Sequence, residues 1–212
     1  MNNERGLFVT VHGIDGTGKT TVTSSLVDSM NADGHKAINY DEYKDKTPNP
    51  YLEKKSEADK NGSLEDRIAI YLESTMYHGK QIDQLLNDGF HVVKSRYLDD
   101  VLAHFAHLGG NKDMMGKLKI QFPIVQPDLK IILSLDEDLR RERINTRGIL
   151  DDRDVEKKEP GSRLYFFEDY LKKANILDPA NSVLHLDSGK LNVEAITKKI
   201  IDHLLNLPGT KN

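Results

Sequence analysis

Cysteine is absent from all 212 residues of the sequence. Disulfide bonds, thiolate zinc sites and catalysis by a cysteine nucleophile are therefore excluded. An excess of positive charge is also missing, because the formal net charge is −4. A general nucleic-acid-binding protein needs lysine and arginine in excess to neutralise phosphate backbones. We therefore expect no nucleic acid polymer as a partner.

Long apolar runs are missing as well. No stretch approaches the roughly 20 residues that cross a bilayer, and the polar residues 1–5 do not resemble a signal peptide. There is no internal repeat and no low-complexity segment. A chain of this length is able to bury the core of one domain. We expect a soluble cytoplasmic protein that forms a single domain over residues 1–212 and binds no membrane.

The most informative motif is the segment 13–20, which matches G-x-x-x-x-G-K-[ST], the phosphate-binding loop. The apolar run 7–11 predicts a strand before it, and residues 21–30 predict a helix after it, so the motif has its required context. We expect Lys19 to reach the β- and γ-phosphates of a nucleotide and the Thr20 hydroxyl to bind Mg²⁺. Contacts with the nucleotide are expected from Gly13, Ile14, Asp15, Gly16, Thr17, Gly18, Lys19, Thr20 and Thr21.

Strands alternate with helices along the rest of the chain, which is typical of an α/β fold with a parallel sheet covered on both faces. Further strands are predicted at 36–40, 90–93, 129–135 and 182–187. Helices are predicted at 63–87, 98–108, 113–121, 136–146, 164–173 and 193–205. Two long connections remain. Residues 41–62 are expected to form a mobile loop with a short helix at 51–58, and the charged residues 147–162 are expected to form a mobile lid.

Among phosphate-loop proteins, the sequence fits a small-molecule kinase better than a switch or a motor. A GTPase needs the motif N-K-x-D, and residues 111–113 lack its spacer. A motor ATPase normally has an acid at the end of an apolar strand, whereas the third predicted strand here ends at Lys94 and Ser95. The arginines of residues 139–163 suit a lid that closes over phosphates, although each one alone is typical of a solvated helix face. They are Arg140, Arg141, Arg143, Arg147, Arg153 and Arg163.

These motifs resemble those of the thymidylate kinase family of nucleoside monophosphate kinases. Residues 13–21 are close to the family's G-x-D-G-x-G-K-[ST]-T, including the aspartate inside the loop. Residues 95–97, Ser-Arg-Tyr, are similar to its D-R-[YH], and residues 127–129 are its P-D-L. Residues 143–153 resemble its lid, R-x-x-x-R-G followed by a cluster of acids and arginine. The resemblance extends over residues 6–205.

The resemblance implies a P-loop NTPase fold, with five parallel strands and the phosphate-binding loop after the central strand. It also implies ATP and Mg²⁺ as cosubstrates and often a homodimer. The catalytic residues it implies are Lys19, Asp15, Arg96 and Arg153. Asp15 would lie near the sugar of the acceptor, Arg96 would contact both acceptor and donor phosphates, and Arg153 would arrive when the lid closes.

Further contacts follow from the same resemblance. Arg143 and Arg147 of the lid would bind the donor nucleotide. Tyr71 would stack on the acceptor base, and Tyr97 would line the same pocket. Each of two residues keeps an alternative. The alternative for Tyr71 is a core position in the long helix, and the alternative for Arg96 is a structural ion pair with a carboxylate.

Four positions depart from the family pattern. His12 stands where the family often has glutamate before its first loop glycine, and Ser95 replaces the aspartate of D-R-[YH]. Ser74 and Thr75 occupy the place of the arginine that reads thymine and its neighbour. A threonine hydroxyl cannot replace the charged, bidentate guanidinium. The arginine expected after the second strand to bind the acceptor phosphate is missing from residues 39–44.

Three hypotheses for function result. The first is phosphoryl transfer from ATP to a nucleoside monophosphate, with dTMP as the first choice. The second is a kinase of nucleosides, resembling deoxynucleoside kinases, in which Asp41 or Glu42 removes the proton of a 5′-hydroxyl. The alternative for both acids is that they are solvated loop residues without a role in catalysis. Lys44 or Lys46 could instead replace the missing arginine as a point charge. The third, motivated by Ser95, is a nucleotide-binding protein with impaired catalysis.

Overall fold

The computed structural model describes residues 5–44, 46, 49–109, 123–147, 158, 160–173 and 182–206. The helix predicted at 113–121 lies outside these residues, and so does most of the predicted lid, including Arg153. Within the described ranges, no helix is both long enough and apolar enough to cross a membrane.

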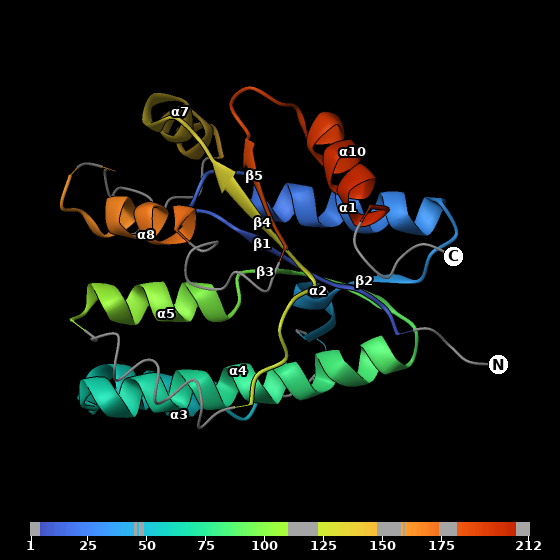
Figure 1. Ribbon diagram of the computed structural model, residues 1–212. Helices are drawn as coiled ribbons and strands as arrows, with labels where there is room; N and C mark the ends of the chain where they lie inside the picture. The colour runs from blue at the N-terminus through green and yellow to red at the C-terminus, as the bar shows by residue number, and fades with distance from the viewer. Residues whose placement is uncertain are drawn as a thin grey trace.

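The predicted parallel sheet of five strands is confirmed (Figure 1). Its strands are β1 (Phe8–His12), β2 (Ala37–Asn39), β3 (His91–Ser95), β4 (Leu129–Ser134) and β5 (Ser182–Asp187), in the order β2-β3-β1-β4-β5. Every neighbouring pair runs parallel. Because β1 is central, the loop that follows it lies in the middle of the sheet's carboxyl edge. Open α/β folds bind their ligands at this edge.

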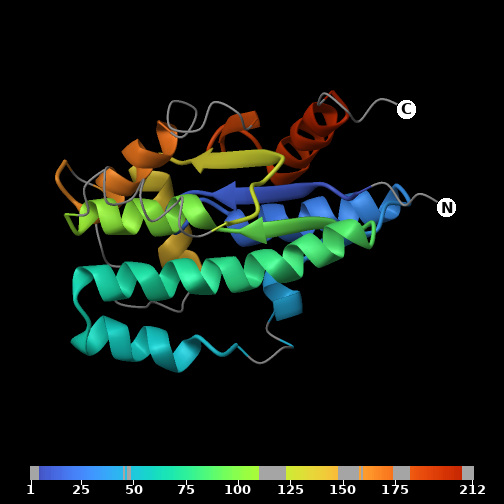
Figure 2. The ribbon, with the colours of Figure 1, turned by 60° about the horizontal axis from the view of Figure 1, so that its bottom comes forward.

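Helices cover both faces of the sheet, as predicted (Figures 1 and 2). α1 (Lys19–Ala32) and α10 (Val193–Leu204) pack on one face. α4 (Leu64–Asn87), α5 (Leu98–His107) and α8 (Arg163–Lys172) pack on the other. Alternate side chains of β1 point to the two faces. Val9 and Val11 join the core under α1 and α10, whereas Phe8 joins the core under α4 and α5.

α4 begins where the sequence predicts it, because Ser63 and Asp66 form a capping box. The Ser63 hydroxyl accepts a hydrogen bond from the backbone N–H of Asp66 at 3.1 Å, and the Asp66 carboxylate accepts one from the N–H of Ser63 at 3.2 Å. Two of the unpaired donors at the helix start are satisfied in this way. The helix then runs for 24 residues and forms one long wall of the site described below.

Residues 41–62 are more helical than predicted. α2 (Tyr40–Lys44) follows β2 directly, and Tyr40, which was expected to end the strand, is fully buried at the start of this helix. The short helix expected at 51–58 is α3 (Leu52–Asn61), which runs beside α4 (Figure 2). The predicted helix is therefore confirmed and extends to Asn61, whereas α2 was not predicted.

Polar contacts hold α3 against α4. The Tyr71 hydroxyl of α4 donates a hydrogen bond to the Asp59 carboxylate at 2.9 Å, and the Lys55 ammonium lies 4.7 Å from the centroid of the Tyr71 ring. Ala58 is the one buried residue of α3. A helix attached in this way has almost no apolar stripe, so hydrophobic periodicity could not reveal its full length.

Candidate active site

The phosphate-binding loop connects β1 to α1 through two glycines with left-handed backbone. Gly16 and Gly18 have φ angles of 89° and 90°, which residues other than glycine rarely adopt. At Gly16 space is also short, since a Cβ would lie 2.8 Å from Cγ of Arg140. Thr17 closes the turn by donating its hydroxyl to the Ile14 carbonyl at 2.8 Å. The loop is thus preformed, with the amino end of α1 at its exit.

Lys19 is the first residue of α1, and its side chain is buried in the loop. Its ammonium donates to the Ile14 carbonyl at 2.9 Å and lies 3.6 Å from the Asp15 carboxylate. Burial, and then the nearby Arg96 guanidinium, lower the pKa of Lys19 to about 8, against the attraction of Asp15. The ammonium is therefore poised for an additional anionic partner at the same place.

A cavity of about 830 Å³ opens beside this loop, and we call it the donor cavity. Thr20 and Thr21, the first exposed residues of α1, line it together with the loop itself. Arg143 and Arg147 of α7 (Glu137–Arg147) also line it. Arg143 donates to the carbonyl of Ser188 at 2.6 Å, which fixes α7 to the end of β5.

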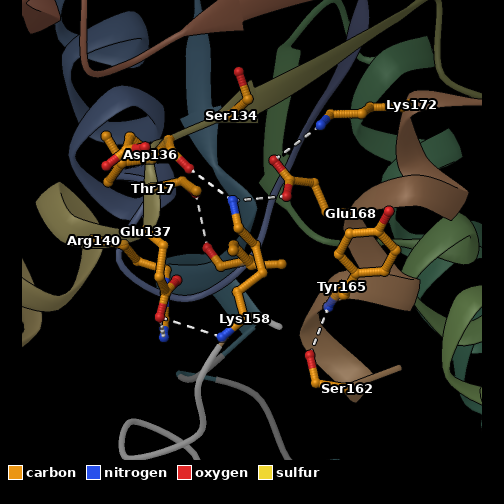
Figure 3. Close-up of polar contacts among 12 residues, drawn as sticks. Thr17, Ser134, Asp136, Glu137, Arg140, Lys158, Ser162, Tyr165, Glu168 and Lys172 are labelled. Atoms are coloured by element: carbon orange, nitrogen blue, oxygen red, sulfur yellow. Dashed lines mark hydrogen bonds and ion pairs between the residues drawn. The ribbon is translucent and has the colours of Figure 1, made fainter. Parts of the chain in front are cut away.

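Arg140 differs from the other arginines of this region because it is fully buried. Its guanidinium pairs with Glu137 at 2.6 Å, and its Cγ lies next to Gly16 of the phosphate-binding loop. Glu137 also accepts a hydrogen bond from the backbone N–H of Lys158 at 3.2 Å, and the Lys158 ammonium pairs with Glu168 of α8 at 2.9 Å (Figure 3). Lys158 thereby joins the predicted lid segment to the elements beneath the loop.

Arg96 follows β3 and lines both the donor cavity and a second cavity. Its φ angle is 60°, the one positive φ of a non-glycine residue in the described part of the chain. Such a backbone is uncommon and often marks functional sites. The guanidinium forms an ion pair with the carboxylate of Asp15. Arg96 therefore has a carboxylate partner, as one alternative from the sequence expected, and that carboxylate belongs to the phosphate-binding loop.

The second cavity, of about 880 Å³, lies between α3, α4, α5 and α8, and we call it the acceptor cavity. Among its described lining residues, the basic side chains outnumber the single carboxylate, Asp100. His78 and His104 add no charge at neutral pH: burial lowers the pKa of His78 to about 4 and also lowers that of His104. The basic side chains are Lys44, Lys55, Lys94, Arg96 and Arg163.

Three of the predicted substrate residues meet in this cavity with Arg96. Tyr71 lines it and packs edge-on against Phe105, with ring centroids 5.6 Å apart. Thr75 lines it too, and its hydroxyl donates to the Tyr71 carbonyl at 2.8 Å. Tyr97 is buried at the cavity wall, with its ring edge-on to Phe8 at 5.1 Å.

Asp41 and Glu42, the other two predicted substrate residues, are not among the residues that line the acceptor cavity. Asp41 accepts hydrogen bonds from the ammonium groups of Lys44 at 2.8 Å and Lys94 at 2.9 Å. Burial raises the pKa of Asp41, but the two lysines outweigh burial and lower it to about 2. Glu42 is exposed and accepts from the Asn39 side chain at 2.7 Å.

Sequence reasoning missed the partner of His12. His12 is almost fully buried at the end of β1, and its Nδ1 lies 2.5 Å from Oδ2 of Asp100. Burial opposes ionisation of Asp100, but His12, Arg96 and Lys19 together outweigh burial, so the pKa of the carboxyl lies below its usual range. Asp100 stands in the first turn of α5 and accepts from the N–H of Tyr97 at 3.2 Å. An acid at the third position of a helix is the one signal that could have suggested this role.

A phosphate-binding loop at the centre of a parallel sheet, beside two cavities that share an arginine, defines a P-loop phosphotransferase. Residues 11–200 match the model of the family described as thymidylate kinase. The chain belongs to the thymidylate kinase family, and it is a nucleotide kinase.

Relatives from bacteria and archaea agree with this assignment. A thymidylate kinase of Brachyspira hyodysenteriae is 30% identical over 152 residues, which cover 69% of this chain and 72% of the relative. A probable thymidylate kinase of Archaeoglobus fulgidus is 25% identical over 212 residues, or 97% and 100% of the two chains. One of Methanocaldococcus jannaschii is 26% identical over 205 residues, or 95% and 97%.

Proposed function

We propose that the protein transfers the γ-phosphoryl group of ATP to the phosphate of a nucleoside monophosphate, with dTMP as the first candidate. The observation that carries this proposal is the charge of the acceptor cavity, whose described walls hold five basic side chains and one carboxylate. A neutral nucleoside needs no such field, whereas a phosphate monoester dianion is stabilised by it. The names of the relatives favour dTMP among the monophosphates.

In this reaction an oxygen of the acceptor phosphate attacks the γ-phosphorus of ATP. The new P–O bond forms, the bond to the β-phosphate oxygen breaks, and ADP leaves. Lys19, the loop N–H groups and Arg96 would spread the charge of the moving group, as such transfers require. The exposed Thr20 hydroxyl suits a Mg²⁺ ligand, and the ion, when bound, would neutralise phosphate charge. Arg153 remains a predicted contributor outside the described residues.

The second hypothesis, a nucleoside kinase, receives less support from this geometry than the first. A base must reach the proton of a 5′-hydroxyl and must have a pKa suited to accept it. Asp41 pairs with two lysines and has a pKa of about 2, and Glu42 is bonded to Asn39 away from the acceptor cavity. An acceptor phosphate is already ionised at neutral pH and needs no base.

A coupled assay of ADP release across monophosphates and nucleosides tests the proposal. We expect turnover with dTMP at ordinary kinase rates, about 1–100 per second, and none above background with thymidine. Lys19→Met should abolish transfer. Turnover confined to nucleosides would restore the second hypothesis, and ATP binding without use of any acceptor would favour impaired catalysis. A homodimer also remains a prediction, which light scattering of the purified protein tests.

A further inference from the structure

Asp41 joins three groups at the edge of the acceptor cavity. Its Oδ1 accepts from the ammonium groups of Lys44 at 2.8 Å and Lys94 at 2.9 Å, and its Oδ2 accepts from the backbone N–H of Ser95 at 2.8 Å. The carboxylate thereby ties α2, which follows β2, to the end of β3. Both lysines line the acceptor cavity.

The cluster joins two ammonium groups to one carboxylate oxygen, Oδ1 of Asp41. It lies in a partly buried place, where the side chains of Lys94 and Lys44 are 10% and 31% exposed. Both lysines also line the acceptor cavity. The low dielectric of a partly buried place would strengthen their attraction for an anion bound in that cavity.

We propose that Lys44 and Lys94 bind the phosphate of the acceptor, and that Asp41 is the positioning residue that holds both ammonium groups in place. This inference rests on the proposed function, because it needs an acceptor with a phosphate. It also explains the absence of an arginine after β2, since residues 39–44 contain only Lys44 as a cation. The second charge comes from the neighbouring strand, where Lys94 lies two residues before Arg96.

Lys130 provides a matched control for Lys94. Both lysines are buried on strands that flank β1, and both lie opposite Thr10 in the parallel register. Lys130 also has a carboxylate partner, Asp99, at 2.9 Å. Lys130 is not among the described residues that line the acceptor cavity, whereas Lys94 is. A change of lysine to methionine therefore removes a buried ion pair in both cases but removes a cavity cation only at Lys94.

Calorimetric titration of dTMP and of thymidine, without ATP, measures the contribution of the phosphate directly. Lys94→Met should weaken dTMP binding by about 10- to 100-fold, the range for losing a hydrogen bond to a charged group, with thymidine binding unchanged within about twofold. Lys130→Met should leave both affinities near wild type. Lys44→Met, which changes a more exposed side chain, should act in the same direction as Lys94→Met. If Lys94→Met and Lys44→Met both retain the wild-type preference for dTMP over thymidine, the inference is wrong.

A double-mutant cycle tests the positioning role of Asp41. Lys94→Met should weaken dTMP binding less in an Asp41→Asn background than in the wild type, because the ammonium there has already lost its anchor. Strictly additive effects would overturn the positioning role. The outcomes also separate the two proposals. A wild-type protein that uses no monophosphate contradicts the proposed function, whereas one that uses dTMP without help from either lysine contradicts only this inference.

Discussion

At the scale of single residues, Asp41 shows how burial and pairing oppose each other. Burial alone would favour the neutral acid, yet two ammonium groups hold the carboxylate ionised. The pKa of Asp41 falls from 3.8 to about 2 on folding, so the ionised group stabilises the folded state. Each unit of pKa difference corresponds to about 1.4 kcal/mol. The pH-dependent part of this stabilisation is therefore about 2 kcal/mol.

This stabilisation should be visible in the pH dependence of unfolding. It is fully present above the unfolded pKa of 3.8 and is lost as the pH falls through the folded pKa of about 2. We expect the difference in unfolding free energy between the wild type and Asp41→Asn to be constant from pH 7 to 5. It should then shrink by about 2 kcal/mol towards pH 2. Urea titrations at several pH values measure it, and a difference independent of pH would contradict the ion pairs of Asp41.

The role of Tyr71 cannot be decided from the sequence, because a tyrosine that packs in the core and one that stacks on a base can occupy the same position of the helix. The structure places its ring in the cavity wall and its hydroxyl on Asp59 of α3. Tyr71→Phe keeps the ring, and we expect the KM for dTMP to stay within about twofold. Tyr71→Ala should raise this KM by about 10- to 100-fold, as stacking on a base contributes roughly 1–3 kcal/mol.

The KM for ATP provides the internal control, because Tyr71 does not line the donor cavity in the described part of the chain. Steady-state kinetics with each substrate varied in turn separates the two constants. Equal increases in both KM values would indicate general destabilisation, and an unchanged KM for dTMP in Tyr71→Ala would leave Tyr71 as a core residue.

At the scale of elements, α4 meets Tyr97, the residue before α5, at Gly79. A Cβ at this position would lie 2.9 Å from the hydroxyl of Tyr97, closer than such contacts normally are. That hydroxyl is buried and has no hydrogen-bond partner among the described residues. The glycine is therefore required by the Tyr97 side chain rather than by the α4 backbone, which is helical here.

Gly79→Ala and Tyr97→Phe should consequently compensate each other. In an open helix, alanine stabilises by about 1 kcal/mol relative to glycine, but here we expect Gly79→Ala to destabilise by about 1–3 kcal/mol, as overpacking does. Tyr97→Phe removes the hydroxyl and should restore most of that loss in the double variant. Chemical denaturation of the four proteins gives the coupling energy. If the double variant is destabilised and shows no coupling energy, the Tyr97 hydroxyl is not the group against which a Cβ at position 79 packs.

The elements also show what periodicity can and cannot predict. α4 could be placed because the capping box at Ser63 is local and its apolar stripe is long. α3 was only partly predicted, because Lys55 and Asp59 attach it through polar groups. The donor half of the site was predictable for the same reason as α4: its loop residues are contiguous in sequence.

At the scale of the whole molecule, the acceptor half could not be assembled from sequence in advance. Lys44, Lys94 and Arg163 come from α2, β3 and α8, which only the order of strands and the packing of helices bring together. The family pattern predicted an arginine after β2, and its absence pointed to a change without showing what replaced it. His12 and Asp100 illustrate the same limit, since 88 residues separate the two members of that pair.

Two cavities that meet at Arg96 should respond to two ligands independently. A non-hydrolysable ATP analogue and dTMP, each at about 100 times its Kd, should each stabilise the folded protein by about 2.7 kcal/mol, which corresponds to a rise in Tm of about 5–10 °C for a chain of this size. Lys19→Met should reduce the shift caused by the analogue and preserve that caused by dTMP. Lys94→Met should do the reverse.

This crossed pattern is specific because a general loss of folding would lower both shifts together. It follows from the placement of the two lysines: Lys19 lines the donor cavity and Lys94 the acceptor cavity, within the described residues. Lys130→Met, which changes a buried lysine outside both described linings, should preserve both shifts even if its Tm is lower. Should Lys19→Met abolish the dTMP shift while Lys94→Met leaves it intact, dTMP would have to bind at the phosphate-binding loop, and the assignment of the two cavities would be wrong.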